Sequence, residues 1–168
     1  MDTMEAILTR RSIRQYTGEP VSEGEIRKII RAGAHAPSAH NRQPWHFVVI
    51  RDPKLILRVA EVHPYAKMAP QAGSCIVVCG DTTCQEEVGF LVEDCSAAIE
   101  NMLIASTALG YGSCWVEGDS LPREEEFKTL LGVPKGKRLL SLVPVGVPEE
   151  WPTIEKRSLE SVLHWQVY

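Results

Sequence analysis

Hydrophobic positions recur along the chain with two different periods, which predict alternating helices and strands. Apolar residues spaced three and four apart predict helices over residues 4–9, 22–36, 53–62, 86–109 and 122–131. Short β-branched or aromatic runs predict strands over residues 45–50, 74–80, 112–116 and 139–147. Strands separated by helices indicate an α/β or α+β layered domain, and with no repeat or linker we expect one domain over residues 1–168.

Polar and special residues mark several of the expected helix ends. Ser22 with Glu25 three residues later forms the pattern of a capping box. Pro37 helps to end the helix that begins there. Gly110 follows the longest predicted helix, in the place where glycine commonly ends a helix.

The predicted helix 86–109 is apolar on more than one face, so we expect it to be central to the domain. Charged residues within it, such as Glu93, Asp94 and Glu100, argue against a membrane span. The chain ends in a tail with six apolar side chains: Leu159, Val162, Leu163, Trp165, Val167 and Tyr168. This tail needs an apolar surface to cover, on its own domain or on a partner subunit.

Composition restricts the class of protein. With 168 residues, 44% of them hydrophobic and 24% charged, the chain has an ordinary globular balance. Acidic residues precede the first apolar stretch, so we expect no signal peptide and a cytoplasmic protein. Five cysteines without a secretion signal indicate reduced, buried thiols. Cys75 and Cys79 are about 13 Å apart along one strand, too far to share a metal ion, and we expect no metal site.

Charge is unevenly distributed in this acidic chain of net charge −4. Residues 1–60 carry ten Lys and Arg against six Asp and Glu, whereas residues 61–134 carry three against twelve. A chain without a basic stripe is a poor nucleic-acid binder, so Arg10, Arg11 and Arg14 fit one small anion better than a polymer. The alternative is that these cations simply stabilise the end of a helix.

Sequence motifs of several enzyme classes are missing, while three other segments carry polar groups. The chain has no GxxxxGK[ST], GxSxG or HExxH motif. The segment RRSIR over residues 10–14 presents guanidinium forks suited to phosphate. The loop APSAHNRQPW over residues 36–45 can bring amide and hydroxyl groups to a ligand. A second basic pair, KR, stands at residues 156–157.

These segments, together with GYGSCWVEGD over residues 110–119, resemble the nitroreductase family of flavoproteins in kind and order. The resemblance extends over residues 4–165. It implies an α+β, nitroreductase-like fold with a central, mainly antiparallel sheet flanked by helices. It also implies an intertwined homodimer with FMN at the subunit interface, so that both subunits build each site.

The resemblance assigns parts of the FMN site to residues of this chain. It implies that Arg10, Ser12 and Arg157 hold the phosphate group. Arg14 would approach the N1 and C2-carbonyl side of the isoalloxazine ring, and Arg11 would contact the cofactor mainly through its backbone.

Two further segments are assigned to the flavin by the same resemblance. The partner chain would line the ring or the ribityl group with residues from its 36–45 loop: Pro37, Ser38, Ala39 and Asn41. The turn formed by Val116, Glu117 and Gly118 would bring backbone amides to the N5 and O4 edge. Lys67 is a further candidate for the pyrimidine edge.

The function implied is that of an FMN-dependent oxidoreductase, in which the flavin supplies the reactivity and no acid–base triad is needed. Hydride would pass from NADH or NADPH to N5, and electrons then to a small-molecule acceptor such as a nitroaromatic or quinone, in a ping-pong cycle. The connections over residues 64–71 and 82–87 are tight, so we expect an open substrate pocket. The alternatives are a non-catalytic flavin-binding or redox-sensing protein, and a phosphate-binding protein without flavin.

Overall fold

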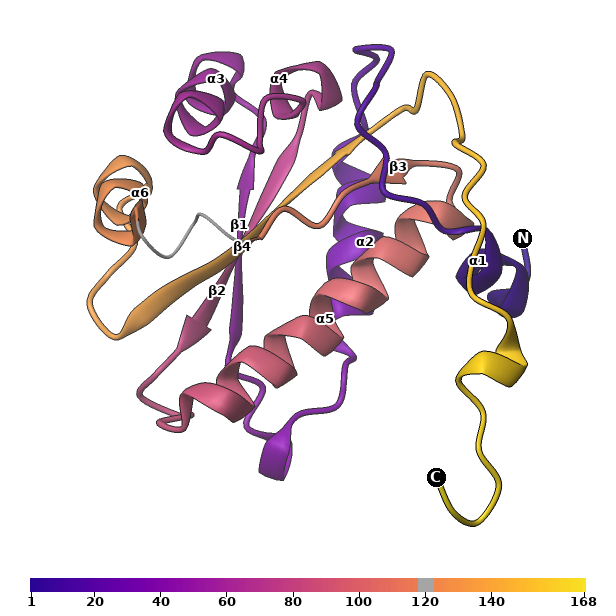
Figure 1. The fold of residues 1–168 in the computed structure, drawn as a ribbon. Helices are drawn as coiled ribbons and strands as arrows, with labels where there is room; N and C mark the ends of the chain where they lie inside the picture. Colours follow the sequence, from indigo (N-terminus) through magenta and orange to yellow (C-terminus); the bar gives the residue numbers. More distant parts are fainter. Residues whose placement is uncertain (118–122) are drawn as a thin grey trace.

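A four-stranded antiparallel sheet forms the centre of the computed structural model, which describes residues 1–117 and 123–168 (Figure 1). Its strands are β1 (Trp45–Ile50), β2 (Cys75–Asp81), β3 (Gly112–Ser113) and β4 (Lys137–Gly146). They lie in the order β1-β2-β4-β3, and every neighbouring pair is antiparallel. The expected α+β class and antiparallel sheet are confirmed.

Helices cover both faces of this sheet (Figure 1). One face packs against α2 (Glu23–Ala34) and α5 (Val88–Ala108), and the other against α3 (Pro53–Val62), α4 (Ala69–Ala72) and α6 (Glu124–Leu131). Alternate residues of β2 serve the two cores, with Ile76 and Val78 on the α5 side and Val77 on the α3 side. A sheet covered on both faces explains why β2 is apolar throughout rather than alternating.

The long helix α5 is central, as its apolar pattern predicts. It buries Leu91, Ile99 and Met102 within the chain, while Phe90 and Val92 remain 41% and 43% exposed. A single copy therefore leaves part of the apolar surface of α5 uncovered. None of the helices in the described ranges has the length and apolar character needed to cross a membrane.

Several local predictions differ from the structure in detail. Ser22 caps α2 by accepting the Glu25 N–H at 3.2 Å, but the Glu25 carboxylate pairs with Lys28 at 2.7 Å instead of completing the capping box. The expected strand 112–116 is reduced to β3 and an isolated bridge between Val116 and Leu142. The short α4 has no counterpart in the prediction, because four residues are too few to show a helical period.

All five cysteines are free thiols, but they are not all buried as expected. Cys84 is exposed, because it lies in the turn that follows β2 rather than in the apolar strand itself. The other four are buried, and burial raises the pKa of Cys75 to about 12 and that of Cys79 to about 11.

The chain after β4 runs back toward the N-terminal segment and then leaves the body of the domain (Figure 1). Glu149 N–H donates to the Gln15 carbonyl oxygen at 3.1 Å, which fixes the start of this tail. Its end carries a short 3₁₀ turn, η3 (Leu159–Ser161), and large exposed side chains such as Trp165 at 74%. Against the described part of the chain, the tail's apolar residues stay exposed and do not show the expected alternative of packing on their own domain.

Candidate functional site

The arginine segment, residues 10–14, leaves α1 (Thr3–Thr9) in an extended form and lies beside β3. Ser12 forms a parallel bridge with Ser113, whose carbonyl oxygen accepts the Ile13 N–H at 2.9 Å. Gly112 permits this approach, because a Cβ there would lie 2.8 Å from Ile13 Cγ1. Ile13 is buried, so the alternation of an extended chain places Arg10, Ser12 and Arg14 together on the opposite side.

The three arginines have different partners. Arg10 Nε lies 3.3 Å from Glu100 Oε1 on α5. Arg11 Nη1 donates to the Leu8 and Arg10 carbonyl oxygens at 2.9 and 2.8 Å, so this side chain caps the end of α1. Within residues 1–117 and 123–168, no carboxylate pairs with Arg14. The alternative role of a cation at a helix end therefore applies to Arg11 and not to the whole segment.

Cys114 lies next to the arginine segment, because its neighbour Ser113 pairs with Ser12. Burial raises the pKa of Cys114, and the nearby Arg14, a hydrogen bond with Ser12 and the nearby Arg10 act in the opposite direction. Arg14 and the buried Cys114 also line one hollow, so the end of the arginine segment and this thiol are neighbours.

A hollow of about 380 Å³ opens beside this cluster. Its lining residues are Arg14, Tyr65, Met68, Cys114, Trp115, Val116 and Glu117. A smaller hollow of about 180 Å³ adjoins it along residues 12–15 and the start of the tail, and Arg14 lines both. Tyr65 and Met68 belong to no recognisable motif, so the sequence does not predict them at the site. Lys67 lies between them in the chain and is exposed.

Glu117 is held in this hollow by a buried serine. Val78 of β2 pairs with Ser141 of β4, and the next residue, Cys79, pairs with Leu139. Strand β4 therefore bulges between Leu139 and Ser141. Ser141 Oγ accepts the Trp115 Nε1–H at 2.9 Å and donates to Glu117 Oε2 at 2.7 Å. Neither Ser141 nor Trp115 could be found from sequence, because the bulge that brings them together leaves no periodic signal.

The amides of the 116–118 turn are not equally available. Val116 N–H donates to the Leu142 carbonyl oxygen at 2.9 Å, and Leu142 N–H donates back at 3.0 Å. The expectation that the Val116 amide faces a flavin is therefore wrong, because this amide belongs to the sheet. Glu117 remains a candidate donor, and Gly118 lies outside the described residues.

The loop residues Pro37, Ser38, Ala39 and Asn41 lie at the opposite end of α5. Ala39 N–H donates to Asp94 Oδ1 at 2.8 Å, near the start of the helix, whereas the arginine segment pairs with β3 beyond its end. At about 1.5 Å per residue, Asp94 lies about 9 Å along the helix axis from Glu100, which pairs with Arg10, and about 21 Å from Ala108, beyond which Ser12 pairs with β3. One copy of the chain therefore does not bring these four residues to Arg10, Ser12 and Arg14.

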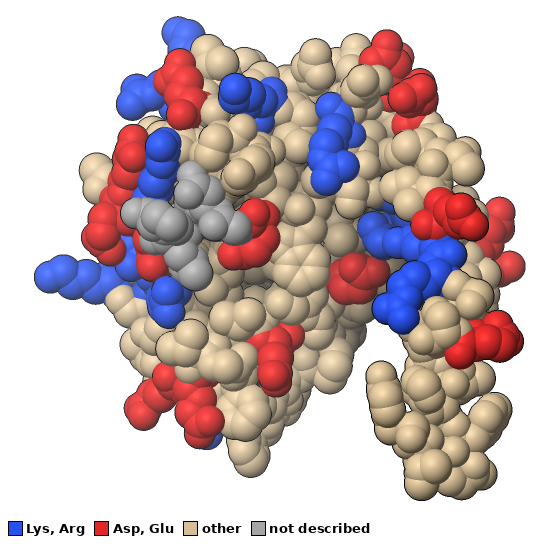
Figure 2. Space-filling model, viewed as in Figure 1, with Lys and Arg blue, Asp and Glu red and all other residues tan. Residues whose placement is uncertain are grey.

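Arg157 lies on the tail, whose first residues pass along the arginine segment. Arg11 and residues 151–153 line a hollow of about 350 Å³ there. The Arg157 guanidinium donates to the Ser161 carbonyl oxygen at 3.1 Å, and among the described residues it forms no hydrogen bond with Ser12. Lys and Arg side chains nevertheless gather, with acidic neighbours, on the side where α1 and the tail lie (Figure 2).

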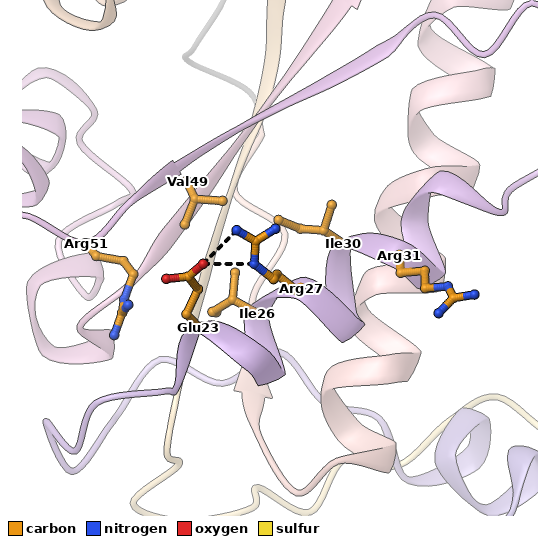
Figure 3. A pocket seen from close by; sticks show the side chains of 7 residues that line it. All are labelled: Glu23, Ile26, Arg27, Ile30, Arg31, Val49 and Arg51. Atoms are coloured by element: carbon orange, nitrogen blue, oxygen red, sulfur yellow. Dashed lines mark hydrogen bonds and ion pairs between the residues drawn. The ribbon is translucent and has the colours of Figure 1, made fainter.

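A separate hollow of about 490 Å³ lies between α2 and β1 (Figure 3). Its apolar floor includes Ile30 and Val49. Two of its three arginines are engaged, because Arg27 pairs with Glu23 at 2.7 Å and Arg51 donates to the Val21 carbonyl oxygen at 3.1 Å. This hollow contains none of the residues expected at the FMN site.

Known proteins are similar to this chain over most of its length. The model of the nitroreductase family matches residues 7–75 and 62–147. An Archaeoglobus fulgidus protein named for NADH dehydrogenase/NAD(P)H nitroreductase activity is 41% identical over 153 residues, covering 89% of this chain and 87% of its own.

Two solved structures extend the likeness to the fold. A protein of the same description from Parabacteroides distasonis has a TM-score of 0.91 and 36% identity, covering 99% of this chain and 98% of its own. A Desulfovibrio desulfuricans nitroreductase in complex with FMN has a TM-score of 0.86 and 31% identity, covering 100% of this chain and 98% of its own. The chain belongs to the nitroreductase family.

Proposed function

We propose that this chain takes hydride from NADH or NADPH onto FMN and passes the electrons to a small acceptor, such as a nitroaromatic or a quinone, in a ping-pong cycle. Membership of the nitroreductase family makes it an oxidoreductase that uses FMN and NAD(P)H. The observation that carries the proposal is that Arg14, which follows Arg10 and Ser12 on the extended segment, lines a hollow together with Glu117.

The donor groups of the site fit FMN. Two guanidinium groups and a hydroxyl on one side of an extended segment suit a phosphate, which accepts several charge-assisted hydrogen bonds. Ser113 Oγ, which is buried beside Ser12, has no hydrogen-bond partner among the described residues. In this proposal Arg10 and Ser12 hold the phosphate, and Arg157 joins them through a movement of the tail.

In this proposal Arg14 and Glu117 provide an electrostatic field and orient the flavin ring. Bound FMN supplies reversible hydride chemistry at its N5 atom. Arg14 lacks a carboxylate partner among the described residues, so its charge is available to stabilise negative charge on the N1 side of a reduced ring. In this proposal the Glu117 N–H donates at the N5 edge, and the Ser141 contact holds the Glu117 side chain.

A homodimer completes the site in this proposal. The loop with Pro37, Ser38, Ala39 and Asn41 serves the flavin of the second copy, since it lies too far from the arginine segment of its own copy. Apolar side chains exposed in one copy supply the interface: Met4, Ile7 and Leu8 of α1, Phe90 and Val92 of α5, and Leu159, Val162, Leu163, Trp165, Val167 and Tyr168 of the tail. Burying them between copies is favourable at about 25 cal/mol per Å² of apolar surface.

Initial velocities test the cycle. NADH or NADPH is varied at several fixed concentrations of a quinone or a nitroaromatic, with FMN-saturated protein. We expect parallel double-reciprocal lines, because the two substrates occupy the same hollow in turn. Converging lines would require both substrates to be bound at once and would refute the ping-pong cycle. Absence of turnover with either donor would leave the alternative of a non-catalytic flavin-binding protein.

A further inference from the structure

The loop over residues 38–43 adopts a backbone that its residues do not favour. His40, Asn41 and Gln43 have φ values of 53°, 57° and 50°, in the left-handed region where a Cβ is disfavoured. None of the three is glycine. Ser38 Oγ accepts the Gln43 N–H at 2.9 Å, which closes the loop on itself. Such a conformation persists only where the surrounding structure fixes it.

A buried chain of polar groups fixes this loop to α5. Asp94 is 6% exposed, and its Oδ1 atom accepts the Ala39 N–H at 2.8 Å. Its Oδ2 atom accepts from Gln85 Nε2 at 3.4 Å, and Gln85 is fully buried. Gln85 Oε1 in turn accepts from Arg42 Nη1 at 2.7 Å. The loop is therefore held at Ala39 and at Arg42 by one connected relay, which we call the Asp94 relay.

Each bond of the Asp94 relay has a fixed direction. An arginine can only donate and an ionised carboxylate can only accept, so Gln85 must present its oxygen to Arg42 and its nitrogen to Asp94. The neighbours of Asp94 on α5 are apolar core residues, among them Leu91, Cys95 and Ala98. A carboxylate is not needed there for packing. Its position is explained by the hydrogen bond that it accepts from the Ala39 N–H of the loop.

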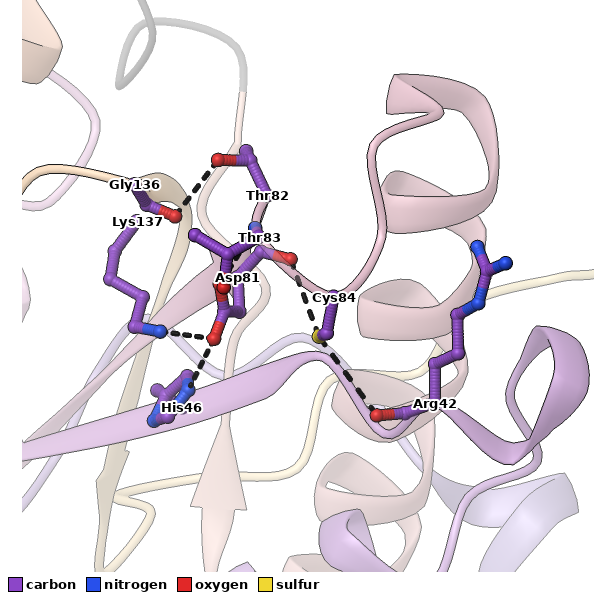
Figure 4. Close-up of polar contacts among 8 residues, drawn as sticks. All are labelled: Arg42, His46, Asp81, Thr82, Thr83, Cys84, Gly136 and Lys137. Carbon is purple, nitrogen blue, oxygen red and sulfur yellow. Dashed lines mark hydrogen bonds and ion pairs between the residues drawn. The ribbon is translucent and has the colours of Figure 1, made fainter.

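Further contacts hold the same region from the side of β2. Cys84 Sγ lies 4.0 Å from the Arg42 carbonyl oxygen and 3.5 Å from that of Asp81, so the backbone of Arg42 adjoins the turn after the strand (Figure 4). Asp81 N–H donates to the Pro44 carbonyl oxygen at 2.7 Å. The loop is thus fixed at both ends while the side chains of His40 and Asn41 remain exposed.

We propose that Asp94, Gln85 and Arg42 are positioning residues, which hold the 38–43 loop in the shape that it needs at the flavin of the partner subunit. The inference rests on the proposed homodimeric flavin site. In it the long helix α5 links the two subunits' sites, because one end lies beside the arginine segment and the other sets the loop that faces the second copy.

A swap of two side chains tests the relay. In Asp94→Asn the new side-chain amide faces Gln85 Nε2, so two donors meet and the relay is broken. The double variant Asp94→Asn, Gln85→Glu reverses the polarity and restores every bond, because the carboxylate introduced at position 85 accepts both from the amide introduced at position 94 and from Arg42. It also keeps the net charge of the wild type. Both variants keep an acceptor for the Ala39 N–H, so a difference between them reports the relay itself.

Two readouts are measured on each variant. In FMN-free protein, hydrogen exchange at the Ala39 amide should become about tenfold faster in Asp94→Asn and return to the wild-type rate in the double variant. The FMN dissociation constant should rise by about tenfold in Asp94→Asn and return to the wild-type value in the double variant. Unchanged values in Asp94→Asn would overturn the proposal, as would a folded double variant that restores neither value.

Mixed dimers test whether the loop serves the second copy. Subunits with Arg10→Ala are combined with subunits with Asp94→Asn, and the mixed species is isolated through two different tags. If each loop acts in the partner's site, this dimer has one intact site and binds FMN there with the wild-type dissociation constant. Two weakened sites would show that the loop acts within its own subunit and would overturn the proposal. A wild type that binds no FMN would refute the proposed function, while the exchange rate at Ala39 would still test the relay.

Discussion

Substitution of either member of the ion pair between Arg10 and Glu100 should change the affinity for FMN, in opposite directions for the two residues. Arg10 Nε lies 3.3 Å from Glu100 Oε1, and the side chains are 21% and 45% exposed. A pair this exposed contributes about 0.2–1 kcal/mol, and its carboxylate competes with a phosphate for the same guanidinium. Glu100→Gln should therefore tighten FMN binding by about two- to fivefold, which corresponds to about 0.4–1 kcal/mol.

Removing the arginine of the pair should weaken FMN binding, and by more than removal of the carboxylate strengthens it. Hydrogen bonds to charged groups contribute about 1.5–3 kcal/mol, so Arg10→Ala should raise the FMN dissociation constant by about ten- to a hundredfold. The dissociation constant is measured by fluorescence titration of FMN at two ionic strengths. The effect of Arg10→Ala should shrink at high salt, because ions screen the phosphate contact.

Glu93→Gln provides a matched control for this pair. Glu93 lies on the same helix and carries the same charge, but it is exposed and forms no ion pair among the described residues. We expect its FMN affinity to match the wild type. If Glu100→Gln and Arg10→Ala weaken binding equally, the ion pair only supports the structure, and Arg10 does not hold the phosphate.

Three further predictions concern the cradle of the site, the ring and the acid stability of the fold. Gly112→Ala should displace the arginine segment and weaken FMN binding, because its Cβ would lie 2.8 Å from a side chain there, whereas Gly89→Ala meets no atom within 4 Å and should leave binding unchanged. Arg14→Gln should lower the reduction potential of bound flavin in an anaerobic redox titration, because the reduced ring loses a counter-charge; an unshifted midpoint contradicts this role. Hydrogen bonds from Lys137 and Thr83 hold the pKa of Asp81 well below its ordinary value of 3.8, so protons bind preferentially to the unfolded chain as the pH falls below that value (Figure 4). The free energy of unfolding should therefore fall more steeply below about pH 4 in the wild type than in Asp81→Asn, and parallel profiles in denaturant titrations would refute this.

The sequence predicts the helices and strands in which buried positions follow a regular apolar pattern. The continuous apolar run of β2 follows from a sheet covered on both faces, and the many-sided apolar pattern of α5 from its central place. The grouping of Arg10, Ser12 and Arg14 also follows from sequence once the segment is extended, because alternate residues share a side.

Contacts between distant segments could not be predicted in the same way. Glu117 depends on Ser141, and this contact arises from a bulge in β4 that has no sequence signature. Asp94 is marked in the sequence only as a charge within an apolar helix, and its partner Ala39 lies 55 residues away. Pairings over such separations are set by tertiary packing, not by local periodicity.

An absorbance spectrum tests the central claim most directly. The protein is supplemented with FMN, desalted and mixed anaerobically with NADH or NADPH, and its oligomeric mass is measured on the same sample. We predict a dimer that retains about one FMN per chain and whose flavin bands bleach on addition of the donor. A desalted protein without flavin bands, or bands that remain oxidised with both donors, would contradict the account.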